Sequence, residues 1–135
     1  MPLQVEIRSP DGMVWSGAAR TIVVPGSKGS MGILRRHAPL TSSLDVGLTR
    51  VTEEGGQEHR FVTGPGLVEV LDDRVEVLVG FAERPEQIDV KRAQEAHDRA
   101  KARLRTRGED VDYARAEAAL QRALQRLRFA GEPRI

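Results

Sequence analysis

The chain has 135 residues, of which 39% are hydrophobic and 30% are charged, and it contains no cysteine. This length fits one ordinary domain or two small ones and excludes a large multidomain enzyme, while the absence of cysteine excludes disulfide scaffolds, thiolate zinc sites and cysteine nucleophiles. The net charge of +1, from 21 basic and 20 acidic side chains, argues against a protein that binds polyanions through the field of the whole molecule.

The beginning of the chain and its apolar runs bear on membrane targeting. Residues 1–6 lack the basic start and apolar stretch of a secretory signal, so we expect the protein to stay in the compartment where it is made. The longest apolar runs, such as residues 75–82, are far shorter than the roughly 20 residues needed to cross a bilayer, so we expect no direct membrane insertion.

Residues 1–85 have the composition of an all-β domain. They contain 11 of the 13 glycines and six of the seven prolines, and short apolar runs alternate with turn residues, which predicts an antiparallel β-sandwich or barrel. The clearest alternation places Val68, Val70, Val75 and Val77 toward the core and the intervening glutamates toward water. The predicted strands cover residues 3–8, 19–24, 46–52, 59–63, 67–71 and 75–82.

A glycine-rich segment at residues 26–32, with Lys28 at its centre, superficially resembles a phosphate-binding loop. Such a loop needs Gly-Lys-Ser/Thr leading directly into a helix, whereas here the chain continues into Ile33 and Leu34 and then reaches Pro39. We therefore predict a glycine-bearing hairpin at this position.

Residues 86–135 are predicted to form an antiparallel two-helix hairpin, so the fold class is α+β with domains 1–85 and 86–135. Asp89 is placed to cap the first helix, and Gly108 with the acidic residues 109, 110 and 112 supplies the break before the second. Because the apolar faces are rich in alanine, they bury little area, and we expect a weakly held hairpin that can open. The residues of these two faces are Ala93, Ala96, Ala100 and Leu104, then Tyr113, Ala116, Leu120, Ala123, Leu124 and Leu127.

Candidate functional groups are few and lie mainly in the helical part. Histidines 37, 59 and 97 have neither metal-ligand spacing nor a nucleophile motif beside them, so we expect no metal site and no catalytic triad. Arg115, Arg122 and Arg126 project along nearly one line of the second helix, because seven residues advance about 700° and four advance about 400°.

Three interpretations of this arginine line remain open. It is a solvated helix face, a set of nucleic-acid phosphate contacts, or one side of a clamp for a small anion that the first helix completes with Arg92 and Arg99. The nucleic-acid interpretation is weak because the helical part has only two aromatic residues, Tyr113 and Phe129, for base stacking. Likewise Asp89 either only caps its helix or joins the arginines around a pocket for adenine or ribose plus phosphates.

An ordered series of motifs resembles the epsilon subunit of bacterial F-type (proton-translocating) ATP synthase over essentially the whole chain. The motifs are Gly32-Ile33-Leu34, His37-Ala38-Pro39-Leu40, residues 64–70 (GPGLVEV), Ala82-Glu83-Arg84 and residues 88–93 (IDVKRA).

The resemblance implies a ten-stranded β-sandwich that sits on the gamma subunit and the c ring, followed by a helical hairpin. The subunit would be a non-catalytic rotor part at the cytoplasmic face of the bacterial plasma membrane, and its helices would extend along gamma to block ATP hydrolysis. The implied rotor interface is Met31, Gly32, Ile33, Leu34, His37 and Pro39. One departure is that the family usually has Pro-Gly where this chain has Arg35-Arg36.

The hexad at residues 88–93 matches a family pattern associated with ATP binding in some bacterial members. The resemblance implies no required cofactor but ATP as a regulatory ligand that binds the folded hairpin. In the extended hairpin the arginines would meet acidic surfaces of the beta and alpha subunits. The implied nucleotide-binding residues are Glu83, Ile88, Asp89, Arg92, Arg122 and Arg126, and the implied inhibitory contacts are Arg115, Arg122, Arg126 and Arg128.

Two alternative functions belong to other classes of protein. The first is a stand-alone β-sandwich binding module whose basic hairpin grips an acidic protein or RNA, since residues 86–135 carry twelve basic and nine acidic groups. The second is a small hydrolase, which would need a nucleophile and a base that the sequence does not offer.

Overall fold

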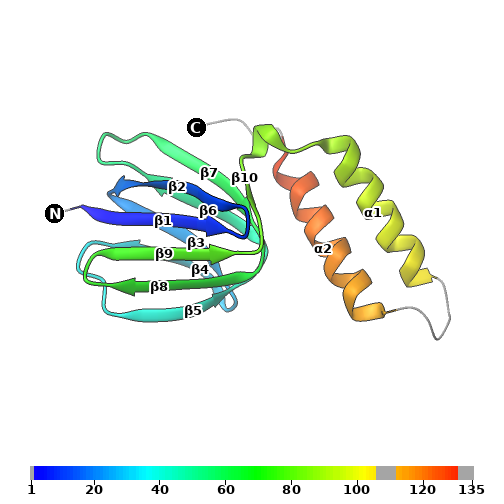
Figure 1. Cartoon of the computed structure of the whole chain (residues 1–135), viewed down its shortest axis with the longest axis horizontal. Helices are drawn as coiled ribbons and strands as arrows, with labels where there is room; N and C mark the ends of the chain where they lie inside the picture. The colour runs from blue at the N-terminus through cyan, green and yellow to red at the C-terminus, as the bar shows by residue number, and fades with distance from the viewer. Residues whose placement is uncertain (1, 106–111, 131–135) are drawn as a thin grey trace. The chain divides into compact units, whose positions relative to one another are not determined.

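The computed structural model describes residues 2–105 and 112–130 of the chain (Figure 1). The chain divides into two compact units, residues 1–84 and residues 85–134. The first is built of strands and the second of helices, so the predicted α+β class, a β-sandwich followed by two helices, is confirmed.

The first unit contains ten strands connected by short turns. Their order in the sheet is β10-β7-β6-β3-β5-β8-β9-β1-β2, with β4 paired to β3. The strands β3 and β5 are joined through the pair Gly26 and Leu44, so the sheet folds over at this link and its two halves form the sandwich. The strands are β1 Leu3–Ser9, β2 Gly12–Ala19, β3 Thr21–Gly26, β4 Gly29–Leu34, β5 Leu40–Leu44, β6 Gly47–Thr52, β7 Glu58–Thr63, β8 Gly66–Leu71, β9 Arg74–Val79 and β10 Ala82–Glu83.

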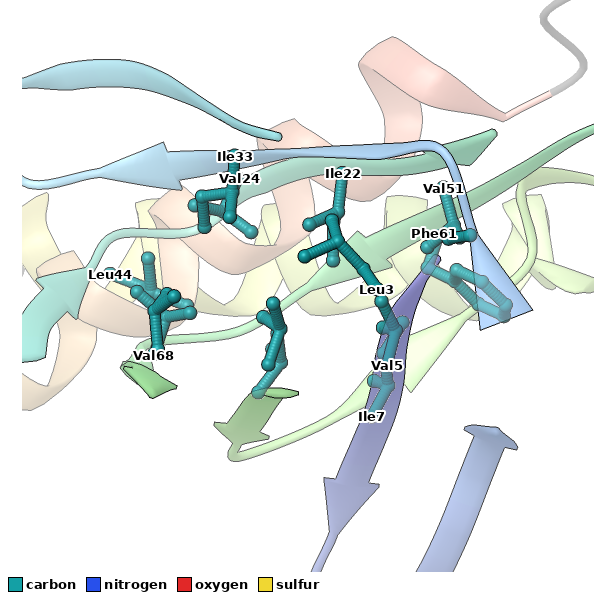
Figure 2. Close-up of a cluster of buried hydrophobic side chains, with 14 of the residues drawn as sticks. Leu3, Val5, Ile7, Ile22, Val24, Ile33, Leu44, Val51, Phe61 and Val68 are labelled. Atoms are coloured by element: carbon teal, nitrogen blue, oxygen red, sulfur yellow. The ribbon is translucent and has the colours of Figure 1, made fainter. Parts of the chain in front are cut away.

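The core lies between the two halves of the sheet and comes from alternate residues of the strands. In β1, for example, Leu3, Val5 and Ile7 are at most 1% exposed, and the side chains between them point away from the core. Figure 2 shows these three side chains facing Ile22 and Val51 across the core. Each large apolar side chain buried in this way contributes about 1.5–3 kcal/mol. The predicted inward valines of β8 and β9 are all 2% exposed or less.

The expectation of a purely antiparallel sheet is wrong for one pair of strands. The strands β1 and β9 are parallel, with Val5 opposite Val75 and Ile7 opposite Val77. Hairpin reasoning from turn residues addresses only strands that are consecutive in the sequence, whereas β1 and β9 are connected through seven intervening strands. The glycine-rich segment does form the predicted hairpin, because β3 and β4 pair through a turn at Ser27 and Lys28.

The predicted strand at residues 75–82 is two strands in the structure. Strand β9 ends at Val79, and after Gly80 and Phe81 the chain pairs with a different neighbour, because β10 bonds to β7. The backbone N–H of Gly64 donates to the Phe81 carbonyl at 2.9 Å, and a Cβ on Gly64 would lie 2.7 Å from the Phe81 ring. Close packing of these two segments therefore requires glycine at position 64.

The second unit contains a short 3-10 helix, Pro85–Gln87, and two α-helices, α1 at Val90–Arg105 and α2 at Tyr113–Phe129. Both predicted caps are present. The Arg92 N–H donates to Asp89 Oδ1 at 3.1 Å, and the Arg115 N–H donates to Asp112 Oδ1 at 3.0 Å, which satisfies a backbone donor at the start of each helix. Residues 108–110, predicted as the helix break, lie outside the described residues.

The buried face of each helix is narrower than predicted. Its buried residues are Ala93 and Ala100 in α1 and Ala116 and Ala123 in α2. Two residues assigned to the apolar face are instead exposed, Tyr113 at 43% and Leu124 at 39%. Tyr113 is the first residue of α2, and Leu124 lies about 100° around the helix from the inward Ala123.

No α-helix in the described part of the chain has the length and apolar character required to span a membrane.

Candidate functional site

A groove of about 260 Å³ lies between α1 and α2 and forms the candidate site of the helical unit. Its lining residues are five arginines and five alanines, and we call it the arginine groove. The arginines are Arg99 and Arg103 from α1 and Arg115, Arg122 and Arg126 from α2, and the alanines are Ala96, Ala100, Ala116, Ala119 and Ala123.

The helical repeat explains how these side chains come together. Arg99 and Arg103 are four residues apart and therefore lie one turn apart on one face of α1. The predicted line on α2, formed by Arg115, Arg122 and Arg126, faces the same groove. Between the two rows the side chains are alanines, which are too small to fill the space between the helix axes. The alanine faces thus create the groove and the arginines supply its charge.

The charge of the groove is of one sign. Its lining set contains five guanidinium groups and no carboxylate, and arginine stays protonated in proteins. Arg103 and Arg126 also lie in the last turns of their helices, where the helix dipole favours cations. Guanidinium groups pair with phosphate oxygens through two parallel hydrogen bonds, so the arrangement is suited to a multiply charged anion such as a chain of phosphates.

The structure gathers some of the predicted nucleotide-binding residues and not others. Arg122 and Arg126 line the arginine groove, whereas Ile88, Asp89 and Arg92 do not belong to its lining. Ile88 is 8% exposed, and Asp89 accepts the hydrogen bond that caps α1. Arg92 has an exposed side chain in the first turn of α1. Glu83 lies in β10 of the other unit.

Sequence reasoning named Arg99 and Arg115 in this region and missed Arg103. Arg115, which the sequence predicts both as part of the anion-clamp line and as an inhibitory contact, lines the groove together with Arg122 and Arg126. Arg128, the fourth residue of that inhibitory set, is exposed and not part of the lining. The four-residue spacing of Arg99 and Arg103 was the signal that could have identified Arg103.

The predicted rotor interface occupies β4 and the turn that follows it. Gly32 and Pro39 are exposed, and Leu34 is 59% exposed. Met31 is half-buried. These side chains are presented on a paired strand, since β4 is bonded to β3 from Gly29 to Leu34.

Two members of that set have structural roles. Ile33 is 0% exposed and belongs to the sandwich core, so its side chain is not available to a partner. His37 is half-buried. Its backbone N–H donates to the Leu34 carbonyl at 3.2 Å, and its ring Nδ1 lies 2.7 Å from the Ala38 carbonyl. Ile33 and His37 therefore fix the strand and turn that carry the exposed residues.

Over residues 2–105 and 112–130, no group of three or more His, Cys, Asp or Glu side chains is arranged so that it could hold a metal ion. His59 Nε2 lies 3.3 Å from Glu53 Oε2, and its ring is 5.2 Å from the ring of Trp15. His97 contacts Asp98 at 3.0 Å, and this hydrogen bond lowers the pKa of the exposed Asp98 carboxyl.

Two family models match consecutive parts of the chain, which together span residues 2–131. Residues 2–85 match the beta-sandwich domain of the ATP synthase Delta/Epsilon chain, and residues 86–131 match its long alpha-helix domain. The ATP synthase epsilon chain of Shouchella clausii is 48% identical over 102 residues, which are 76% of this chain and 76% of that protein. The epsilon chain of Desulforudis audaxviator is 46% identical over 101 residues, 75% of this chain and 73% of its own length.

Solved structures share the fold. One is a chain of the Euglena gracilis mitochondrial ATP synthase, from a cryo-EM structure of the OSCP/F1/c-ring part in rotational state 1. It superposes with a TM-score of 0.80 at 24% identity, and the match covers 92% of this chain and 78% of that chain. A chain of the Tetrahymena thermophila mitochondrial ATP synthase, from its central stalk and c-ring, gives a TM-score of 0.62 at 15% identity, covering 95% of this chain and 96% of that chain.

Proposed function

Because the chain belongs to the family of ATP synthase delta and epsilon chains, we propose that it couples the catalytic head of an ATP synthase to its ion-driven c ring as part of the central stalk. The observation that carries this proposal is the match of both units, in order, to the two domains of that family. Its bacterial relatives are epsilon chains, which are non-catalytic stalk subunits, and the chain is likewise not an enzyme.

The proposal gives the β-sandwich the role of docking on the gamma subunit and the c ring. Its structural relatives belong to ATP synthase assemblies that include the c ring and, in the second case, the central stalk. Exposed Leu34, Gly32 and Pro39 would make the contact, and buried Ile33 would hold the strand that presents them. In the bacterial cell the chain would then be a peripheral protein at the cytoplasmic face of the plasma membrane.

We further propose that the helical unit restrains ATP hydrolysis and that ATP controls this restraint. Five arginines around one groove provide enough positive charge to bind the phosphates of a nucleotide. The hexad at the start of α1 would contribute Ile88, Asp89 and Arg92. No cofactor is required for this role, because ATP would act as a regulatory ligand.

The packing of the helical unit is weak enough for ligand binding to decide between its folded and extended forms. Its buried residues in α1 and α2 are four alanines. Burial of each alanine stabilises the hairpin by about 2 kcal/mol less than burial of a leucine would, at about 0.8 kcal/mol per methylene. A ligand that binds only the folded hairpin stabilises it by RT ln(1 + [ATP]/Kd), about 2.7 kcal/mol at a hundredfold excess over Kd. An increment of this size can decide between two forms of a weakly packed hairpin.

The same arginines would have different partners in the two forms. In the folded hairpin, Arg122 and Arg126 face the groove. In the extended hairpin, they and the exposed Arg115 and Arg128 would meet acidic surfaces of the beta and alpha subunits and block hydrolysis. Low ATP would then favour the inhibitory form.

The experiment is a calorimetric titration of ATP into the full chain, with variants of arginines inside and outside the groove. Removing one charge-assisted hydrogen-bond partner in Arg126→Ala should weaken ATP binding about ten-fold or more. Arg105→Ala is the matched control, because Arg105 is an exposed arginine in the last turn of α1 that does not line the groove. Equal ATP affinity in the wild-type chain and Arg126→Ala would refute the site.

The second measurement places Arg103→Ala in the assembled ATP synthase, because Arg103 lines the groove and is not one of the proposed inhibitory contacts. This variant should make hydrolysis more strongly inhibited at a given ATP concentration, because the folded hairpin binds its ligand more weakly. The family match to both units also leaves no observation that favours a stand-alone binding module for RNA or an acidic protein.

A further inference from the structure

The β-sandwich has a basic pocket that none of the roles above explains. Its volume is about 450 Å³, and its walls come from three separate places in the sequence. Arg20 lies between β2 and β3, Leu34, Arg35 and Arg36 lie at the end of β4 and in the turn after it, and Asp73 lies in the turn between β8 and β9.

The positive charge of the basic pocket is not neutralised within the described residues. Arg20, Arg35 and Arg36 are exposed, and over residues 2–105 and 112–130 their side chains take part in no hydrogen bond or ion pair. Asp73 is the single carboxylate of the lining, and its Oδ1 accepts the backbone N–H of Arg36 at 2.7 Å. The pocket therefore presents three guanidinium groups whose donors are free for an external anion.

The backbone of Arg36 adds a second, independent observation. Its φ is 62°, in the left-handed region that glycine adopts readily and that residues with a Cβ rarely adopt. The bond to Asp73 and the turn closed by the His37 N–H on the Leu34 carbonyl hold it there. Backbone strain of this kind is found mainly at functional sites, and here the strained residue places its side chain in the lining of the basic pocket.

We infer that the basic pocket binds an acidic side chain, aspartate or glutamate, on the protein surface where the β-sandwich docks. This inference rests on the docking role proposed above. Leu34, 59% exposed, is both a lining residue of the basic pocket and a member of the proposed docking surface. Arginine pairs with a carboxylate through two parallel hydrogen bonds, so the guanidinium groups suit the carboxylate of an aspartate or glutamate. The apolar Leu34 beside them suits the protein surface that carries this carboxylate.

A free inorganic anion fits the basic pocket less well. The three arginines are exposed rather than buried, so the pocket does not exclude water from a small ion, and an exposed ion pair contributes little until a partner surface covers it. A docked protein surface removes that water and strengthens each pair. The basic pocket would then fix which acidic position of the partner lies beside Leu34.

The test is rebinding of the full chain to an ATP synthase complex from which this subunit has been stripped, measured over a range of salt concentrations. Arg35→Ala and Arg36→Gly should each weaken binding about ten-fold or more and reduce its salt dependence. Arg36→Gly removes the side chain while relieving the backbone strain, so a loss of binding in this variant does not come from unfolding. Arg8→Ala is the matched control, since Arg8 is an exposed arginine of β1 outside the basic pocket.

The possible outcomes separate this inference from the function on which it rests. Failure of the wild-type chain to rebind would refute the docking role itself. Normal rebinding of the wild type together with wild-type affinity in both Arg35→Ala and Arg36→Gly would refute only the basic pocket. A third outcome, competition of rebinding by inorganic phosphate at low millimolar concentration with loss of that competition in Arg35→Ala, would identify a free-anion site and also overturn the inference.

Discussion

The weak packing of the helical unit can be tested by removing a single buried methyl group. Ala123 in α2 is 1% exposed and lines the floor of the arginine groove, whereas Ala118 on the same helix is exposed. Both residues lie in the interior of α2, so replacing either one by glycine costs about 1 kcal/mol of helix propensity. Ala123→Gly also removes a buried methyl, which adds about 0.8 kcal/mol.

The difference between the two variants isolates the packing contribution. Ala118→Gly should reduce the stability of the helical unit by about 1 kcal/mol and Ala123→Gly by about 2 kcal/mol. The excess of about 0.8 kcal/mol corresponds to a roughly four-fold larger population of the opened hairpin. The helix-propensity cost is the same in the folded and extended forms if α2 is helical in both, so it cancels from the equilibrium between them. Only the excess from lost packing should therefore shift this equilibrium.

Amide hydrogen exchange of α2 is the appropriate assay, because it measures local opening while the β-sandwich stays folded. Protection factors along α2 should fall more in Ala123→Gly than in Ala118→Gly, with the sandwich amides unchanged in both. Equal losses of protection in the two variants would show that the alanine face is not the packing surface of the hairpin. The account of the helical unit as a weakly held switch would then be wrong.

Two further substitutions test the sandwich and the hexad. Gly66→Ala should destabilise the sandwich by about 3 kcal/mol or more, because a Cβ at this position would overlap the Leu78 carbonyl oxygen. Gly32→Ala is the control, because a Cβ there would have no atom within 4 Å, and this variant should melt within a degree or two of the wild type. Similar melting temperatures for the two variants would contradict the β8–β9 register. Asp89→Ser should retain the cap of α1, unlike Asp89→Ala, which should lose about 1 kcal/mol of helix stability. If ATP affinity is unchanged in Asp89→Ser, the carboxylate acts only as a cap.

The strands that could be predicted from the sequence are those whose own side chains alternate. Val68 and Val70 in β8 flank the polar Glu69, and both are buried as expected. Strands β2 and β5 were missed because neither sequence, GMVWSGAA or LTSSL, has a sustained alternation of apolar and polar residues. Hydrogen bonds to β1 and β8 hold these strands in the sheet, so their conformation depends on tertiary pairing that local propensity does not encode.

The candidate site was predictable on one helix and only partly on the other. The 3.6-residue period alone places Arg115, Arg122 and Arg126 on one line of α2. Which residues of α1 face that line depends on the register between the two helices, and composition and spacing do not determine this register. For this reason the sequence suggested Arg92 and Arg99, while the groove is lined from α1 by Arg99 and Arg103.

Arg36 is the residue at which local sequence preference and structure disagree most clearly. The β8–β9 turn also uses positive φ, at Asp72 (49°) and Asp73 (60°), but aspartate is one of the residues with a Cβ that adopt this region most readily. Arg36 has no such preference, and over residues 2–105 and 112–130 its side chain has no hydrogen bond or ion pair that would offset the strain.

Replacing Arg36 by glycine should therefore stabilise the isolated chain by about 1 kcal/mol, measured by urea or thermal unfolding. The left-handed conformation costs an L-residue about 1–2 kcal/mol. The greater conformational freedom of glycine in the unfolded chain offsets part of this gain. Asp73→Ala should have the opposite effect, since it leaves the Arg36 N–H without its carboxylate acceptor. A loss of stability in Arg36→Gly would mean that the guanidinium stabilises the fold. The strain would then be explained by intramolecular contacts, and the argument that it serves a partner would fail.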